Sequence, residues 1–186
     1  MQLTSDHDCA VIEIGTNRAG EIFTLTNLVQ PTAGLITNIG LEHLEMLVDI
    51  DGVEIEETTL FELLIKAEKR CFINYDDERL QKYKDLYSNS ITYGLEENSD
   101  YHIRVNFDEE LHPELNIVCP NDIASPPVVA RLKATGLAYA LNSIAASAVG
   151  WDFGLTSSEI AEGLENFVPV AGESGYARMV VERHNN

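Results

Sequence analysis

The apolar positions of this chain fall into short, nearly unbroken runs, separated by longer stretches with helical spacing. Runs without polar alternation are typical of strands buried on both faces of an α/β sheet. They cover residues 9–14, 35–39, 71–74 and 90–93. The stretch between the first two runs ends before Pro31, and its apolar face consists of Ile22, Leu25, Leu28 and Val29. This order predicts a strand, a helix and a second strand joined by a right-handed parallel crossover.

Three further helices are predicted over residues 49–69, over 78–87 and from 135 onward, and a fourth begins at the capping-box sequence Thr156-Ser157-Ser158-Glu159. The 49–69 helix opens with five acids, namely Asp49, Asp51, Glu54, Glu56 and Glu57. Acids near a helix N-terminus suit the helix dipole, and we expect them to form a solvated face. Asp76-Asp77 precede the 78–87 helix, where capping accounts for at least one of them and ligand contact is the alternative.

Residues 100–132 differ from the rest because apolar and polar positions alternate there. Extended runs at 101–107, 115–119 and 128–132 are separated by proline-containing turns, which predicts a small antiparallel sheet. We expect His102 and His112 to be exposed and residues 178–182 to form a last strand. The predicted fold class is therefore α/β, a single domain over residues 1–186 with a mainly parallel sheet flanked by helices and an antiparallel subregion at about 100–132.

The charge of the chain narrows the list of partners. Its 31 acidic and 12 basic residues give a net charge of −19, which argues against nucleic acid or an anionic membrane surface. No apolar stretch approaches the roughly 20 residues of a membrane span, and no signal peptide is apparent. Cys9, Cys71 and Cys119 show no metal-binding spacing. We expect a cytoplasmic protein with buried, reduced thiols.

The candidate chemistry follows two of the predicted strands. Thr37-Asn38-Ile39-Gly40 leads into His43 and two acids just past a strand end, where open α/β sheets bind ligands. Glu13 lies inside the first apolar run, where a carboxylate needs a partner or a metal. Carboxylate and imidazole groups suit a divalent ion such as magnesium or manganese. For His43, an ordinary hydrogen-bonded role is the alternative.

These segments resemble the central domain of the Mur ligases, and within that family the branch that adds D-alanyl-D-alanine to a UDP-muramoyl tripeptide. The matching residues occur in family order. They are Glu13-Ile14-Gly15-Thr16-Asn17, Ile36-Thr37-Asn38-Ile39-Gly40 with His43-Leu44-Glu45, Ile73-Asn74 with Asp76-Asp77, Gly136 with Asn142, and Pro169 with Arg178.

The resemblance implies an ATP-dependent amide ligase that activates a carboxylate as an acyl phosphate. It implies magnesium at Glu13 and His43, the adenine side of ATP at Asn142, and the ribose near Arg178. It further implies substrate contacts from Asn17 and Asn38, with a nucleotide or a UDP-muramoyl peptide as the ligand. Phosphoryl transfer needs mainly metal charge and positioning, which agrees with such a residue set.

Three departures from the family pattern affect the chemistry. The glycine-rich phosphate loop ending in Gly-Lys-Thr/Ser does not occur in this sequence, and we expect the family's N- and C-terminal domains to be absent as well. Glu57 stands at the family's carbamoylated lysine, and its carboxyl carbon falls roughly 3–4 Å short of the carbamate position at about 1.5 Å per bond. Tyr139 replaces an asparagine three residues before Asn142.

Three hypotheses remain open from the sequence. The chain is a piece of a Mur ligase that is inactive alone, a non-catalytic relative that works as a binding or assembly module, or an enzyme completed by another chain. The substitutions at Glu57 and Tyr139 favour a loss of catalytic activity, because truncation of a ligase does not explain them. A missing phosphate-loop strand would leave an open edge or a gap in the sheet, and open edges recruit partners. We therefore expect self-association into a homo-oligomer.

Overall fold

The computed structural model describes residue 4 and residues 7–40, 44–118 and 126–169. The elements, in chain order, are α1 (Glu21–Val29), β1 (Ala33–Ile36), α2 (Leu44–Leu47), α3 (Ile50–Lys66), β2 (Arg70–Asn74), α4 (Glu78–Leu86), β3 (Ser90–Gly94), β4 (Tyr101–Phe107), β5 (Pro113–Val118), β6 (Val128–Arg131), α5 (Leu137–Asp152) and α6 (Ser157–Asn166). The predicted α/β class is confirmed. None of the described helices is both long and apolar enough to cross a membrane.

The described strands form one six-stranded sheet in the order β1-β2-β3-β4-β5-β6. Neighbours from β1 to β4 run parallel, and β4, β5 and β6 run antiparallel. The predicted antiparallel subregion therefore exists, but it continues the parallel sheet and is not a separate one. The sheet has no gap between its described strands, and β1 and β6 are its two edges.

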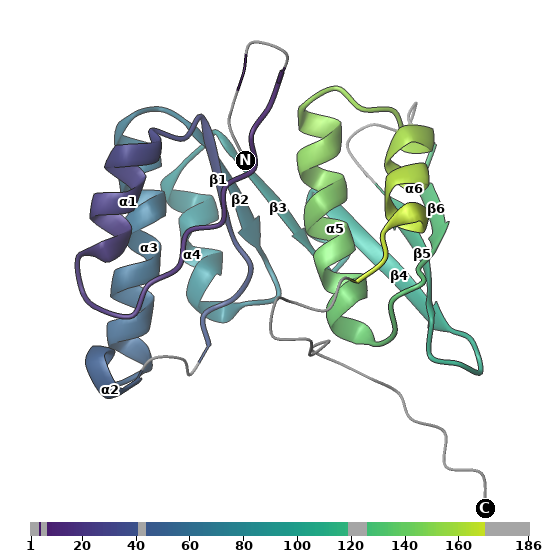
Figure 1. Ribbon diagram of the computed structural model, residues 1–186, viewed down its shortest axis with the longest axis horizontal. Helices are drawn as coiled ribbons and strands as arrows, with labels where there is room; N and C mark the ends of the chain where they lie inside the picture. The colour runs from purple at the N-terminus through teal and green to yellow at the C-terminus, as the bar shows by residue number, and fades with distance from the viewer. Residues whose placement is uncertain (1–3, 5–6, 41–43, 119–125, 170–186) are drawn as a thin grey trace, which may run out of the picture.

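Helices cover both faces of the sheet (Figure 1). The strand β2 explains the layering, because Cys71 and Ile73 point to one face and Phe72 to the other. Cys71 and Ile73 join a core with α3 and α4, including Phe61 and Leu64, while Phe72 joins a second core with α5 and α6. Helix α1 lies outside α3. Because β1, β2 and β3 run parallel, their carboxyl ends lie at the same end of the sheet, beside α5.

Strands β3 and β4 run parallel although their connection, residues 95–100, is short, because β4 begins beside the end of β3. Only the last two residues of β3 pair with the first two of β4, Tyr93 with Tyr101 and Gly94 with His102. The Asp100 carboxylate accepts hydrogen bonds from the Thr92 backbone N–H and hydroxyl, both at 2.8 Å. The side chain of Asp100 thus satisfies a β3 backbone donor beyond the end of the parallel pairing.

The predicted first strand over residues 9–14 is wrong, because the structure has coil there. Val11 is 92% exposed and Ile12 is 50% exposed, and Cys9 and Glu13 are exposed as well. An apolar run forms a strand only when a neighbouring strand pairs with it. Glu13 therefore carries no burial cost that would require a partner.

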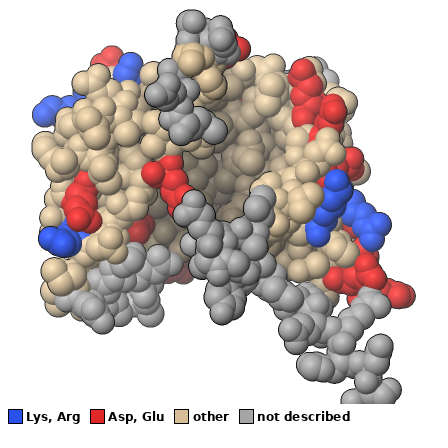
Figure 2. Space-filling model, viewed as in Figure 1, with Lys and Arg blue, Asp and Glu red and all other residues tan. Residues whose placement is uncertain are grey.

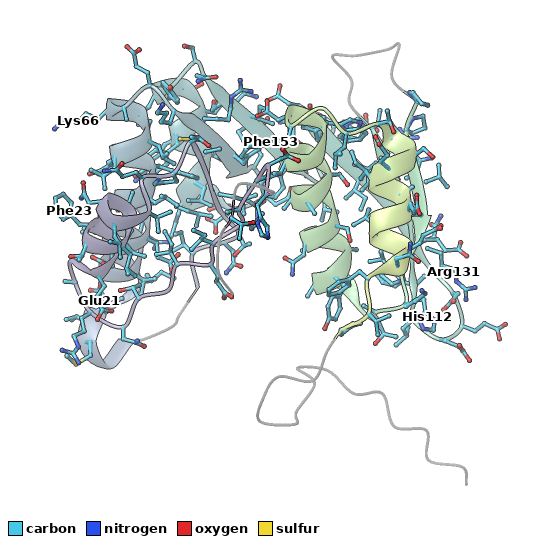
Figure 3. All side chains as sticks on the ribbon, turned by 45° about the horizontal axis from the view of Figure 1, so that its top comes forward. Glu21, Phe23, Lys66, His112, Arg131 and Phe153 are labelled. Carbon is cyan, nitrogen blue, oxygen red and sulfur yellow. The ribbon has the colours of Figure 1, made fainter. Side chains whose placement is uncertain are left out.

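Other burial predictions also need correction. Leu28 is 78% exposed, whereas Thr26 is buried in its place on α1, because α1 rests on α3 with a narrow face. Phe23 likewise points outward from α1 (Figure 3). His102 is only 7% exposed, because its strand lies between β3 and β5. Glu56, expected on a solvated face, is 5% exposed.

The two described cysteines differ in exposure, which gives a testable prediction. Burial raises the pKa of the Cys71 thiol to about 12, while Cys9 is exposed. Because the thiolate is the reactive form, iodoacetamide at pH 8 should label Cys9 rapidly and leave Cys71 unlabelled until the chain unfolds. Peptide mapping by mass spectrometry measures both. Equal labelling rates in the folded protein would contradict the placement of Cys71 in the core.

Candidate functional site

A cavity of about 210 Å³ lies at the carboxyl ends of β1, β2 and β3, against α5. Its polar lining consists of Thr37, Asn38, Asn74, Asp76, Tyr93 and Asn142, and its apolar lining includes Ala138, Leu141, Ile144 and Ala145. Ligand sites of open parallel sheets occur at this end of the strands. The volume is below the roughly 300–1,000 Å³ of pockets that enclose a drug-sized ligand, so the cavity has room for one ring system.

Two adjacent aspartates hold the loops around this cavity together. Asp77 caps α4 by accepting from the Arg79 backbone N–H at 2.9 Å, and its other oxygen accepts from the Ile39 N–H at 2.7 Å. The Asp76 oxygens accept from the Leu95 N–H at 2.8 and 2.9 Å. Capping thus accounts for Asp77, as predicted. Together the pair ties the segments after β1 and β3 to the end of β2.

The same end of the sheet depends on a close approach at Gly94. A Cβ at this position would lie 2.6 Å from an Asp76 oxygen, so a side chain there would displace the aspartate. Asn74 adds a further link, because its side-chain amide donates to the Thr37 carbonyl at 2.6 Å. The cavity wall is therefore fixed by hydrogen bonds between strand ends.

Asn38, which follows β1, and Asn142, on α5, both line the cavity, and both are exposed residues. Within the described chain neither side-chain amide has a hydrogen-bond partner. Each amide offers donors and an acceptor, and the apolar part of the lining includes Leu141 and Ala145. Tyr93 donates its hydroxyl to the Ile36 carbonyl at 3.2 Å, and burial raises the pKa of Tyr93, so the phenol stays neutral. This arrangement suits a planar ring with polar edges.

The loop before α1, which includes Asn17, is held by two carboxylates. Glu56 on α3 accepts from the backbone N–H groups of Gly20 at 2.7 Å and Ile22 at 2.8 Å. Glu21 accepts from the N–H of Asn17 at 2.7 Å, and this bond holds the pKa of Glu21 below its usual value. Gly20 provides no side-chain cap for α1, so Glu56 caps it from a neighbouring helix.

The structure separates several of the predicted site residues. Glu13 and Asn17 are exposed before α1, Glu57 is half-buried on α3, and none of the three lines the cavity. His43 and Arg178 lie outside the described residues, so their predicted roles remain predictions.

The predicted magnesium site is not complete in the described chain. No three His, Cys, Asp or Glu residues of that part are close enough to hold an ion. Glu13 by itself is one exposed carboxylate, whereas magnesium favours six oxygen ligands, several of them water or phosphate. Of the two predicted magnesium ligands, Glu13 is the one within the described residues, and its exposed carboxylate does not line the cavity.

Tyr139, expected at the position of a family asparagine, does not line the cavity. Its ring packs against Phe167, with 6.1 Å between ring centroids, and its backbone carbonyl accepts from the Ser143 hydroxyl. Tyr139 therefore contributes to packing between α5 and the end of α6.

A second, more open hollow of about 420 Å³ lies beside His112, Arg131, Lys133 and Glu165. Figure 3 shows His112 and Arg131 close together at the β4–β5 end of the molecule. Asp108 binds both side chains, and Arg131 holds the pKa of Asp108 below its usual value. The main cation of this hollow is thus already paired, and we assign the candidate site to the first cavity.

Sequence reasoning missed Tyr93 and Gly94 in the lining. The third parallel strand, residues 90–93, was predicted, and the rule that ligands bind at strand ends applies to it as well. That rule would have found both residues.

Comparison with known proteins places these observations in a family. Residues 1–150 match the family model of the Mur ligase middle domain. The UDP-N-acetylmuramoyl-tripeptide--D-alanyl-D-alanine ligase of Haemophilus influenzae is 29% identical over 173 residues, which are 92% of this chain and 36% of that protein. The chain thus spans about a third of the length of this relative.

Solved structures support the fold. The crystal structure of MurF from Acinetobacter baumannii superposes with a TM-score of 0.79 at 22% identity, covering 92% of this chain and 37% of that one. MurF ligase from Thermotoga maritima, in complex with ADP, gives a TM-score of 0.68 at 20% identity, covering 86% of this chain and 36% of that one.

Proposed function

This chain belongs to the Mur ligase family through its middle domain, and from that premise we propose that it is the nucleotide-binding part of an ATP-dependent amide ligase of peptidoglycan precursor synthesis. The observation that carries the proposal is the cavity at the ends of β1, β2 and β3. Its two asparagine amides, which have no hydrogen-bond partner among the described residues, and its apolar wall suit an adenine ring. The ADP complex of the Thermotoga maritima relative supports a nucleotide as the ligand.

We further propose that the chain has no ligase activity on its own. Its sequence contains no glycine-rich phosphate loop, so no backbone cradle and no lysine would hold the β- and γ-phosphates. Glu57, at the position of the family's carbamoylated lysine, is too short to replace it. By resemblance, Glu13 and His43 remain proposed magnesium ligands, Arg178 a proposed ribose contact, and Asn17 a proposed substrate contact.

The alternative is a non-catalytic binding or assembly module, with a UDP-muramoyl peptide or a protein as its partner. Tyr139 favours this alternative, because it packs against Phe167 and offers no amide toward a base. The two functions differ in one property, which is whether ATP binds in the cavity.

Calorimetric titration of ATP into the full chain tests the proposal. We expect dissociation constants between about 10 μM and a few millimolar, because the ring contacts remain without the phosphate contacts. Asn142→Ala and Asn38→Ala should each weaken binding about 5-fold, the effect of one lost hydrogen bond of about 1 kcal/mol.

Asn106→Ala is the matched control, because Asn106 is an exposed amide on β4 outside the cavity. Its affinity for ATP should equal that of the unchanged chain. An absence of heat and of thermal stabilisation at millimolar ATP would reject nucleotide binding and favour the binding or assembly module.

A further inference from the structure

The outer edge of β1 has no strand partner in the described chain, since β2 is its one neighbour in the sheet. Edge strands are usually protected by charged residues, proline or a bulge. The four residues of Ala33–Ile36 include neither a charge nor a proline, and the first three are only half-buried. This edge is open to pairing with another strand.

A second apolar segment also has no strand partner among the described residues. Residues 9–14 read Cys-Ala-Val-Ile-Glu-Ile, yet Figure 1 draws them as coil, in purple. Val11 is 92% exposed and Ile12 is 50% exposed. No backbone hydrogen bond joins this segment to β1 in the region that the structure describes. Its composition favours a strand, but no neighbouring strand of the described chain forms backbone hydrogen bonds with it.

The segment starts from a fixed point at Thr16. This residue is buried, and its hydroxyl donates to the Arg18 carbonyl at 2.9 Å and lies 3.4 Å from a Glu56 oxygen. Gly15, just before it, has nothing within 4 Å of where a Cβ would stand. The chain before Thr16 is therefore tethered at one end and sterically free at Gly15.

We propose that two copies of this chain exchange residues 9–14, so that each segment adds as a strand to the free β1 edge of the other copy. The exchange satisfies both unpaired features at once, and it closes as a two-fold dimer. Six residues span about 20 Å as a strand, against about 13 Å for the four residues of β1. Direct β1–β1 pairing fits less well, because it would leave Val11 and Ile12 exposed.

The net charge of −19 on each copy predicts an unusual salt dependence for this dimer. Like charges repel over the Debye length, which shrinks from about 30 Å at 0.01 M salt to about 10 Å at 0.1 M. An interface made of backbone hydrogen bonds and apolar side chains is itself little weakened by salt. Dimerisation should therefore strengthen as salt is added.

Sedimentation equilibrium of the full chain, from micromolar to millimolar concentration at low and high salt, tests the exchange. We expect a monomer–dimer equilibrium that tightens with salt, and a dimer at least tenfold weaker in Val11→Lys. Leu28→Lys is the control, because Leu28 is 78% exposed on α1 and the charge change is the same. It should leave the dimer unchanged.

A monomer at every concentration and salt would overturn the proposal. A dimer that both lysine variants weaken equally, or that neither weakens, would also overturn it. Because Val11 is exposed, the dilute variant should unfold at the same temperature as the unchanged chain, which separates lost pairing from misfolding. The exchange does not use the Asn38–Asn142 cavity, so its failure leaves the proposed function untouched.

Discussion

Glu56→Ala should lower the free energy of unfolding by about 3 kcal/mol, because it leaves one buried and one part-buried backbone donor without an acceptor. The Glu56 carboxylate accepts from the N–H groups of Gly20 and Ile22 and is only 5% exposed. Its negative charge also lies at the N-terminus of α1, where it stabilises the helix dipole. Urea unfolding followed by circular dichroism measures the change in the midpoint.

The control for this variant lies on the same helix. Glu62 is exposed on α3, and Glu62→Ala should change the stability by no more than about 0.5 kcal/mol. Glu56→Gln should fall between the two, since its amide keeps one acceptor oxygen and loses the charge. If Glu56→Ala were as stable as Glu62→Ala, the capping of α1 by α3 would be refuted.

The second large effect is expected at Asp77, where Asp77→Ala should destabilise the chain by about 2 kcal/mol. The substitution removes the cap of α4, worth about 1 kcal/mol, together with the hydrogen bond from the Ile39 N–H, worth a similar amount. These bonds measure 2.9 and 2.7 Å. Thermal unfolding of the variant and of the unchanged chain measures the difference in their stability.

Asp85→Ala serves as the comparison, because Asp85 is an exposed acid near the C-terminal end of α4. Removing a negative charge there relieves an unfavourable interaction with the helix dipole, so its stability should be unchanged or slightly higher. Equal losses in both variants would mean that Asp77 does not link the β1 loop to α4.

Much of the fold could be predicted from the apolar pattern. The runs at 71–74 and 90–93 became β2 and β3, and Thr156 and Glu159 form the capping box that their spacing predicted. These signals are local, because a strand buried on both faces or a helix cap is specified by a few neighbouring residues. Long-range pairing is not specified in this way.

The run at 9–14 shows where the local pattern fails. Its apolar residues resemble those of β2, but a strand needs a neighbour, and residues 9–14 pair with no strand of the described chain. The prediction that Glu56 lies on a solvated face was wrong for a related reason. The Glu56 side chain is buried because it contacts the N-terminus of α1 at Gly20, which is 36 residues away in the sequence. The residue pattern of α3 alone does not indicate such a contact.

The structure brings two of the predicted site residues to one place, while their roles in binding remain predictions. Asn38 and Asn142, far apart in sequence, line one cavity. The predicted role of Glu13 depended on a first strand over residues 9–14, which the structure does not form.

Figure 2 shows that the surface is hollowed between the α1–α3 side and the α5–α6 side, and that most charged side chains visible in this view lie on the flanks. A net charge of −19 is thus compatible with a recess whose lining is mainly neutral. An acidic protein binds an anionic ligand where the local field permits it, and this cavity is lined mainly by neutral groups, with Asp76 engaged by a backbone donor.

The most direct test of the nucleotide cavity is an amide ¹H–¹⁵N NMR titration of the chain with ATP. We predict saturable shifts of the side-chain amides of Asn38 and Asn142 and of the backbone amide of Gly94, with no shift at Asn106. Shifts confined to other regions, or none at millimolar ATP, would contradict the assignment of the cavity at the ends of β1, β2 and β3 as a nucleotide site.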